Sequence, residues 1–359
     1  MLIVKTKAAI LYKLNSPLII DEVEIPSLKR GQVLVRILYS GVCRAQYNEI
    51  IGLKGPDRYL PHLLGHEGSG IVKEIGPGVS KVKKGDYVVL SWIKGNGLDA
   101  LPKQYHRGKE IINAGAVTTF SHYSVVSENR VTKISKKMPA DKAAVIGCAM
   151  ATGGGIVNNT LNVKKNSSIA IFGVGGIGAS AILAAKLRRC SKIIAIDIHQ
   201  KKLAFAKKLG ASHGILVNGK NIFSQIQKVA PGGVDYAIDA SGAKVAMETA
   251  FEAINYTGTL VIAGNLAKDE KICLHPFELI KGKQIRGTWG GETVPQRDFP
   301  KYIHAYCSGQ LPLDKLITHY FKLEDINHAF DLLRNGGAGR IIIEMTENKM
   351  RGNSNPILI

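Results

Sequence analysis

Cysteine is scarce in this chain of 359 residues, and its five cysteines lie far apart, at positions 43, 148, 190, 273 and 307. An odd and scattered set excludes the disulfide framework that staples small secreted domains. Long apolar runs are also missing. None approaches the roughly 18 residues that a membrane-spanning helix needs, and Lys5, Lys7 and Lys13 interrupt the first apolar stretch. We therefore expect an unprocessed, cytoplasmic protein with no membrane partner.

Acidic residues are few beside basic ones. The chain has 28 Asp and Glu against 48 Lys and Arg, which gives a formal net charge of +20. Such a charge suits an anionic partner, either nucleic acid or a phosphorylated or carboxylated substrate. The lysines, however, are dispersed in short pairs such as Lys83-Lys84 and Lys207-Lys208, and no nucleic-acid-binding motif accompanies them. We expect a solvated basic surface and no nucleic-acid partner, whereas an anionic small molecule stays open.

Two patterns divide the chain, whose composition is that of an ordinary globular protein. Residues 1–149 show short strand-like segments between glycine and proline turns. From 150–289, apolar β-branched segments alternate with helical ones, which is typical of a parallel sheet with helices on its faces. The next segment predicts helices at 300–307 and 323–334, and residues 346–359 lack periodicity and predict a flexible tail. These patterns predict an α/β protein.

A glycine motif follows the first apolar segment of the second region. Gly173, Gly175 and Gly178 form Gly-x-Gly-x-x-Gly between a predicted strand and a predicted helix. By itself such a motif can be a flexible turn. In this context the first glycine permits a tight turn, the second lets the backbone approach a pyrophosphate, and the third lets the helix pack on the strand. Because helix amides favour phosphate, we predict a dinucleotide site here that includes Gly176 and Ile177.

Asp197 ends the next apolar strand, where a carboxylate can bind the ribose hydroxyls of the adenosine. A carboxylate at this place repels a 2′-phosphate. Lys201 and Lys202 follow it and act in the opposite direction, because an ammonium group attracts that phosphate. The pattern therefore favours NAD over NADP.

Four residues offer groups that suit a metal ion, namely Cys43, His66, Glu67 and Cys148. Two thiolates and one imidazole can hold a catalytic zinc and leave its fourth position open for water or substrate. Their spacing is long, so only folding can bring them together. Taken singly, a buried cysteine commonly packs as a small apolar residue. From the residue types alone, a shared metal and separate structural roles both stay open.

Several motifs in a fixed order resemble those of the zinc-containing alcohol dehydrogenases of the medium-chain dehydrogenase/reductase superfamily. Besides the glycine motif they are Gly-Val-Cys-Arg at 41–44, Gly-His-Glu-Gly-Ser-Gly at 65–70, Gly-Asp-Tyr-Val at 85–88, Gly-Cys-x-x-x-Thr-Gly at 147–153 and Gly339-Arg340. The resemblance covers 5–345. It implies a GroES-like β-rich catalytic domain formed by 1–149 and 290–345, interrupted by a Rossmann domain with a doubly wound parallel sheet at 150–289. It also implies a homodimer or homotetramer.

The resemblance assigns roles to particular residues. The metal ligands it implies are Cys43, His66, Cys148 and, in exchange with water, Glu67. The cofactor contacts it implies outside the glycine motif come from Thr152 and from Arg44 and Arg340, which clamp the pyrophosphate. Asp197 and Lys202 complete the set of candidate cofactor residues. The implied reaction transfers a hydride between an alcohol, a polyol or a sugar-like secondary alcohol and NAD, with zinc as Lewis acid.

Three positions depart from the family's pattern. Many members have a hydroxyl residue, an aspartate and a histidine where this chain has Ala45, Gln46 and Asn48. In those members the first and third residues pass on the alcohol proton, and the aspartate orients the zinc-binding histidine. The proton of this chain's substrate needs another route, and Tyr47, His62 or water are the candidates.

The segment 91–122 lacks the four cysteines with which many members hold a structural zinc. We therefore predict one zinc ion per chain. Trp92 in this segment and Trp289 either line the active-site cleft or pack in the core. Two other functions stay open: a non-catalytic NAD- and zinc-binding member of the fold, which Ala45 favours, and a zinc-free, quinone-type reductase, against which the four metal-binding residues argue.

Overall fold

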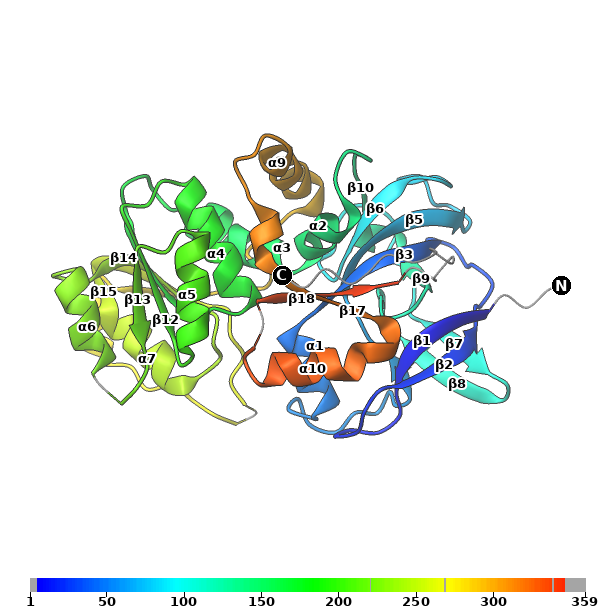
Figure 1. The fold of residues 1–359 in the computed structure, drawn as a ribbon, viewed down its shortest axis with the longest axis horizontal. Coiled ribbons are helices and arrows are strands. Elements are labelled where there is room, and N and C mark those ends of the chain that lie inside the picture. The colour runs from blue at the N-terminus through cyan, green and yellow to red at the C-terminus, as the bar shows by residue number, and fades with distance from the viewer. Residues whose placement is uncertain (1–4, 220, 268, 338, 346–359) are drawn as a thin grey trace, which may run out of the picture.

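The protein has two parts, each built around β-sheets, which lie side by side. The computed structural model describes residues 5–219, 221–267, 269–337 and 339–345. One part contains the first and the last described segments of the chain, and the middle of the chain forms the other (Figure 1). The predicted α/β class is confirmed, and the predicted tail at 346–359 lies outside the described residues. Within the described segments, no helix is long and apolar enough to cross a membrane.

The first part combines a small closed barrel with a larger, mainly antiparallel sheet. The barrel has the strand order β1-β2-β7-β8-β4, with bounds Lys5–Leu11, Ile19–Glu24, Lys103–Arg107, Glu110–Ala114 and His62–Leu63 in that order. The larger sheet has the order β10-β6-β5-β3-β18-β17, and β9 pairs with β3. Its strands are Val131–Lys133 (β10), Tyr87–Ser91 (β6), Glu67–Ile75 (β5), Gln32–Val42 (β3), Arg340–Glu344 (β18), Ile317–Lys322 (β17) and Tyr123–Ser127 (β9).

The last described segment returns to the first part and completes its sheet. In β18, Ile341 pairs with Val42 of β3 in antiparallel register, and β17 lies parallel to β18 on the other side. Because these pairs are direct neighbours in the sheet, Arg340 comes to lie beside Cys43. The helices of this part are α1 (Arg44–Ile50), α2 (Ala140–Ala144), α3 (Ala149–Gly155), α9 (Pro295–Cys307) and α10 (Ile326–Arg334).

The second part is a parallel sheet with helices on its faces (Figure 1). Its strand order is β13-β12-β11-β14-β15-β16, and the bounds are His213–Leu216, Lys192–Asp197, Ser168–Phe172, Val234–Asp239, Ile254–Ile262 and Gln284–Gly287. The helices are α4 (Gly176–Leu187), α5 (Gln200–Leu209), α6 (Ile222–Val229), α7 (Lys244–Ala253) and α8 (Pro276–Ile280). The chain order reverses between β11 and β14, and sheets of this kind bind ligands at such a point, outside the carboxyl ends of the strands.

One predicted helix begins earlier than expected. The sequence indicated a start at Pro300, but α9 begins at Pro295 and Pro300 lies inside it. Pro295 in the first turn is well tolerated, because the backbone N–H that a proline lacks would have no hydrogen-bond partner there. Burial explains why the helix continues through Pro300, since Phe299 is 0% exposed and Tyr302 is 5% exposed.

Candidate functional site

A groove of about 440 Å³ runs past the carboxyl ends of β11, β12 and β14. The backbone of Gly173 has φ +89°, and a Cβ there would lie 2.9 Å from Ser241 Cα. A Cβ on Gly178 would collide with the carbonyl oxygen of Gly173, so α4 packs on β11 only with glycine at this position. At Gly175, which caps α4, no described atom lies within 4 Å of the place of a Cβ. This open space above a helix N-terminus fits a bound pyrophosphate.

Asp197 and Lys202 both line this groove. The Asp197 carboxylate is 7% exposed and accepts hydrogen bonds from the backbone N–H groups of Val174 (2.8 Å) and His199 (2.9 Å). These two bonds fix the carboxylate at the end of β12, and each oxygen keeps a lone pair for a further donor. Burial, opposed by the Asp197 charge, lowers the pKa of Lys202. The structure thus brings together the predicted glycine motif and the predicted ribose-binding residue.

Three separate segments bring the candidate metal ligands together. Cys43 follows β3, His66 and Glu67 lie at the start of β5, and Cys148 precedes α3. The Sγ atoms of the two cysteines are 4.0 Å apart. One ligand atom from each of the four residues lies within 4.8 Å of those of the other three. Cys43 and Cys148 also line the dinucleotide groove, so this cluster opens onto it.

The donor groups of this cluster fit a zinc ion. His66 Nε2 is buried and has no hydrogen-bond partner among the described residues. An unsatisfied buried polar atom costs about 1–3 kcal/mol, which a bound cation removes. Two sulfur ligands and one imidazole nitrogen are a common set for a catalytic zinc with one open position.

The two thiols differ in their protonation. The hydrogen bond with Cys148, helped by the charges of His66 and Arg340, lowers the pKa of the Cys43 thiol. The same contact, together with burial, raises the pKa of the Cys148 thiol. The lowered pKa of Cys43 favours its thiolate, which is the form of cysteine that binds a metal.

Glu67 and Arg340 form a buried ion pair beside the cysteines. Their exposed fractions are 0% and 4%. Gly41 makes the room for this pair, because a Cβ there would lie 2.6 Å from the Glu67 carboxyl carbon. Arg340 also borders the groove, since a Cβ on Gly176 would lie 2.8 Å from its Nη1. The predicted pyrophosphate clamp thus connects the metal cluster with the glycine motif.

The two other predicted cofactor residues are Arg44 and Thr152, of which Arg44 lines the groove. The Arg44 guanidinium lies 5.2 Å from the centre of the Tyr47 ring and is hydrogen-bonded to the carbonyl oxygen of Leu333 (3.3 Å). Thr152 is 5% exposed, and its Oγ1 has no hydrogen-bond partner in the described part of the chain. An orphaned hydroxyl is consistent with the predicted nicotinamide contact.

Helix α1 places its side chains in three directions. Ala45 and Asn48 line the groove, whereas Gln46 and Glu49 line a second cavity. Tyr47 lines neither, and its ring lies against Arg44 and a hydrophobic cluster. The role of Tyr47 as proton carrier stays a prediction.

Gln46 has a contact that sequence reasoning missed. Its Oε1 accepts the backbone N–H of Gly65, directly before His66. Gln46 therefore holds the backbone of the histidine segment, whereas the family's aspartate would hold the ring. The residue type alone gave no signal of this, because an amide bonds equally well to many groups.

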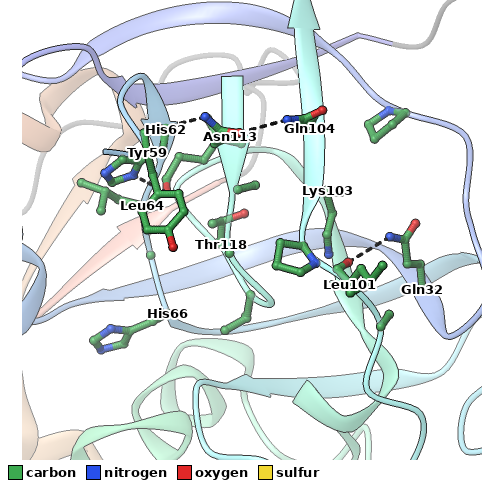
Figure 2. A pocket seen from close by; sticks show the side chains of 18 of the residues that line it. Gln32, Tyr59, His62, Leu64, His66, Leu101, Lys103, Gln104, Asn113 and Thr118 are labelled. Atoms are coloured by element: carbon green, nitrogen blue, oxygen red, sulfur yellow. Dashed lines mark hydrogen bonds between the residues drawn. The ribbon is translucent and has the colours of Figure 1, made fainter. Parts of the chain in front are cut away.

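The second cavity has a volume of about 990 Å³ and is lined by His66 and by residues of α1, β4, β7 and β8 (Figure 2). On one wall, His62 Nε2 lies 2.8 Å from Asp57 Oδ2, and its Nδ1 lies 3.1 Å from the carbonyl oxygen of Leu63. Both ring nitrogens thus lie beside oxygen acceptors, and the role of His62 in the proton route stays a prediction. Glu49, Asp57 and His62 also form the second group of metal-type side chains in the described residues.

No residue of the segment 91–122 belongs to either of the two groups of described side chains that could hold a metal ion. The segment forms instead the β7–β8 hairpin of the barrel. Trp92 contacts Cys148, and its ring makes an edge-to-face contact with Trp289, with centroids 5.3 Å apart. Trp289 is 79% exposed. This exposure argues against core packing for Trp289, and its place in the active-site cleft stays a prediction.

Known families match both parts of the chain. A family described as alcohol dehydrogenase GroES-like domain matches residues 29–136, and one described as zinc-binding dehydrogenase matches residues 176–307. These matches confirm the predicted combination of a GroES-like and a Rossmann domain.

Full-length relatives and solved structures show the same likeness. S-(hydroxymethyl)glutathione dehydrogenase of Aspergillus oryzae is 32% identical over 96% of this chain and 97% of its own length. Alcohol dehydrogenase class-3 of Oryza sativa subsp. japonica is 33% identical over 95% of this chain and 97% of its own. The crystal structure of benzyl alcohol dehydrogenase from Acinetobacter calcoaceticus superposes with a TM-score of 0.88 at 28% identity, covering 96% of this chain and 100% of that one.

Proposed function

Because this chain belongs to the zinc-containing alcohol dehydrogenase family and is a zinc-dependent alcohol oxidoreductase, we propose that it transfers hydride between a polar alcohol and NAD. In this proposal one zinc ion per chain is held by Cys43, His66 and Cys148, next to Glu67. The observation that carries it is the convergence of two thiols and an unpaired imidazole nitrogen beside a dinucleotide groove. Family membership also sets aside the non-catalytic and the zinc-free alternatives.

The chain's own residues do the positioning. When bound, zinc supplies a Lewis acid and NAD a hydride acceptor. Gly175 and the N-terminus of α4 hold the pyrophosphate, Asp197 binds the ribose, and Thr152 Oγ1 offers a hydrogen bond near the nicotinamide. Holding the cofactor and the metal at once in a largely buried site turns the reaction into a unimolecular step. Because Ala45 cannot relay a proton, the candidates for carrying it remain Tyr47, His62, water and the substrate's own hydroxyls.

The second cavity supports a polar substrate. Side-chain amides and a hydroxyl line it, from Gln46, Gln104, Asn113 and Thr118. Its volume of about 990 Å³ is at the upper end of the range for small-molecule sites. An alcohol with several further polar groups, such as a polyol or sugar, would find further hydrogen-bond partners on these walls.

Two features support our proposals for assembly and compartment. β16 is the edge of the parallel sheet, and Tyr256, Phe277 and Ile280 of the same part are exposed. An open sheet edge with apolar side chains nearby is a surface that a second copy can cover, so we propose a homodimer or homotetramer built on this part. All five cysteines are free thiols, which suits the cytoplasm.

Metal analysis and turnover test the proposed function together. We expect the purified protein to contain one zinc ion per chain and to reduce NAD when supplied with a panel of polyols and hydroxy acids. Removal of zinc with a chelator should abolish this turnover, and added zinc should restore it. A protein that binds NADH but contains no zinc, or that contains two zinc ions per chain, would contradict the proposal.

Replacing Asp197 tests the preference for NAD. The Asp197→Asn variant keeps the side chain's size but loses its charge, so it no longer repels a 2′-phosphate and it binds the ribose hydroxyls less strongly. We expect the ratio of kcat/KM with NAD to that with NADP to fall by roughly 10- to 100-fold, the effect of losing charge-assisted hydrogen bonds. Asp331→Ala, at an exposed position of α10, is the control and should leave the ratio unchanged. An unchanged ratio in Asp197→Asn would assign cofactor choice to other residues.

A further inference from the structure

Lys103 of β7 is a buried lysine on the wall of the second cavity. It is 5% exposed, and its Nζ donates a hydrogen bond to the carbonyl oxygen of Val125 (2.5 Å). Figure 2 shows Lys103 on one side of the cavity and the imidazoles of His62 and His66 on the other, with Thr118 between them. An ammonium group has three N–H donors, so one neutral carbonyl leaves it short of partners.

Another lysine of the chain shows how a buried ammonium is usually satisfied. Lys283 is 7% exposed and lies 3.2 Å from the Glu278 carboxylate. It also donates to the carbonyl oxygens of Phe251 (3.2 Å) and Glu252 (2.9 Å). Lys103 has no such carboxylate in the described residues, and burial is the sole cause that lowers its pKa, to about 7. A buried charge without a counter-ion is costly, so this site favours a ligand that supplies one.

The acids that line the same cavity do not supply that counter-ion. Each of the three has a cation or histidine of its own: Glu49 with Lys54 (3.3 Å), Asp57 with His62 (2.8 Å) and Asp99 with Lys94 (2.6 Å). Lys29 and Arg30 add two exposed positive charges to the lining. The cavity wall around Lys103 is therefore positively charged and lacks a carboxylate partner, a combination that favours the binding of an anion.

We propose that the substrate is an alcohol with a carboxylate or phosphate group at the end remote from the carbinol, and that Lys103 binds this anionic group while the carbinol lies at the metal cluster. This inference rests on the proposed function, because it places the reacting end of the substrate beside His66. It makes Lys103 a specificity-determining residue. Carboxylate and phosphate share the anionic oxygens that an ammonium recognises.

Anion binding should be linked to proton uptake. Burial lowers the pKa of Lys103 to about 7, so at pH 8 most of the free protein carries a neutral amine there. An anion beside it raises that pKa again, and the complex takes up as much as one proton from the buffer. At pH 6 the amine is protonated before and after binding, so with a carboxylate, which stays ionised at both pH values, the uptake should vanish. If Lys103 only forms the hydrogen bond to Val125 and binds no anion, no proton uptake is expected at either pH.

Steady-state kinetics on the zinc- and NAD-loaded enzyme test the inference with three alcohols of equal chain length: 1-hexanol, 6-hydroxyhexanoate and 6-hydroxyhexyl phosphate. We expect Lys103→Met to lower kcat/KM by roughly 10- to 100-fold for the preferred anionic alcohol, the loss of a charge-assisted contact, and to leave 1-hexanol within about threefold. The two anionic alcohols decide between carboxylate and phosphate. The matched control is Lys283→Met, which removes a lysine of similar burial outside the cavity and should retain the preference.

Titration calorimetry separates this inference from the proposed function, because it needs no turnover. Hexanoate and hexyl phosphate are titrated into the loaded protein at pH 8 and pH 6, each in two buffers of different ionisation enthalpy. Proton uptake at pH 8 that disappears in Lys103→Met and persists in Lys283→Met supports the anion site, even if no alcohol is oxidised and the proposed function fails. Oxidation of 1-hexanol without preference for either anionic alcohol, or equal proton uptake in wild type and Lys103→Met, overturns the inference and leaves the proposed function standing.

Discussion

Replacing Cys148 by alanine is expected to remove bound zinc and to lower kcat/KM for alcohol oxidation by about three orders of magnitude or more. Cys148 Sγ lies 4.0 Å from Cys43 Sγ, and the thiol is 5% exposed, so no water-exposed group can take its place as a ligand. Cys43 and His66 are then left as ligands, and because the remaining candidate, Glu67, is held in its ion pair with Arg340, the cluster lacks the third protein ligand of a catalytic zinc site. Metal content by mass spectrometry and steady-state kinetics with NAD measure the two effects.

Cys190→Ala is the matched control for this variant. Cys190 is a half-buried free thiol just after α4, remote from the groove and the cluster. Its replacement should change neither zinc content nor turnover. A Cys148→Ala protein that keeps one zinc ion per chain and wild-type turnover would exclude the proposed metal centre, provided that its circular dichroism and unfolding curve match those of the control.

Replacing Arg340 by methionine is expected to destabilise the protein by about 3–5 kcal/mol, the usual cost of leaving one member of a buried ion pair uncompensated. Glu67 is 0% exposed and would be left without its counter-ion beside the two thiols. Because Arg340 also borders the groove, the affinity for NADH should fall as well. Urea unfolding at saturating zinc and NADH fluorescence titration measure these changes.

A double variant shows whether the charge of Glu67 causes the loss. Glu67→Gln has nearly the shape of glutamate but no charge, so Arg340→Met combined with Glu67→Gln should recover part of the stability lost in Arg340→Met. The two residues are in direct contact, and their effects on the free energy of unfolding should therefore not be additive. Strictly additive effects, or a loss below about 1 kcal/mol in the single variant, would contradict a strong buried pair.

The dinucleotide groove could be predicted from the sequence because its parts are close along the chain. Gly173 to Gly178 form one strand-to-helix turn, and Asp197 ends the next strand. Glycine is required at both positions for local reasons. Gly173 has a positive φ, and at Gly178 a side chain would collide with the carbonyl oxygen of Gly173. Local sterics of this kind are the same in any chain with this pattern, so the pattern predicts the structure.

The second cavity could not be predicted, because its wall comes from contacts between distant strands. From the sequence alone, Lys103 is expected to be one of the many solvent-exposed lysines of a very basic chain. It becomes buried because β7 closes the barrel and its side chain reaches Val125 of β9, where Tyr105 of the same strand binds the N–H of Val125 (2.7 Å). A two-residue period along β7 puts Lys103 and Tyr105 on one face, but only the barrel shows that this face is inside.

The sequence by itself determined which chemical groups this protein can use: two thiols, an imidazole, a glycine cradle and an acidic residue for the ribose. The tertiary structure alone decided which of these groups meet. It placed Cys43 and Cys148 4.0 Å apart and paired Glu67 with Arg340 through the register of β18 against β3. The physical reason is that side-chain chemistry and short turns are local properties, whereas distances between remote segments are set by sheet pairing and by the packing of one core against another.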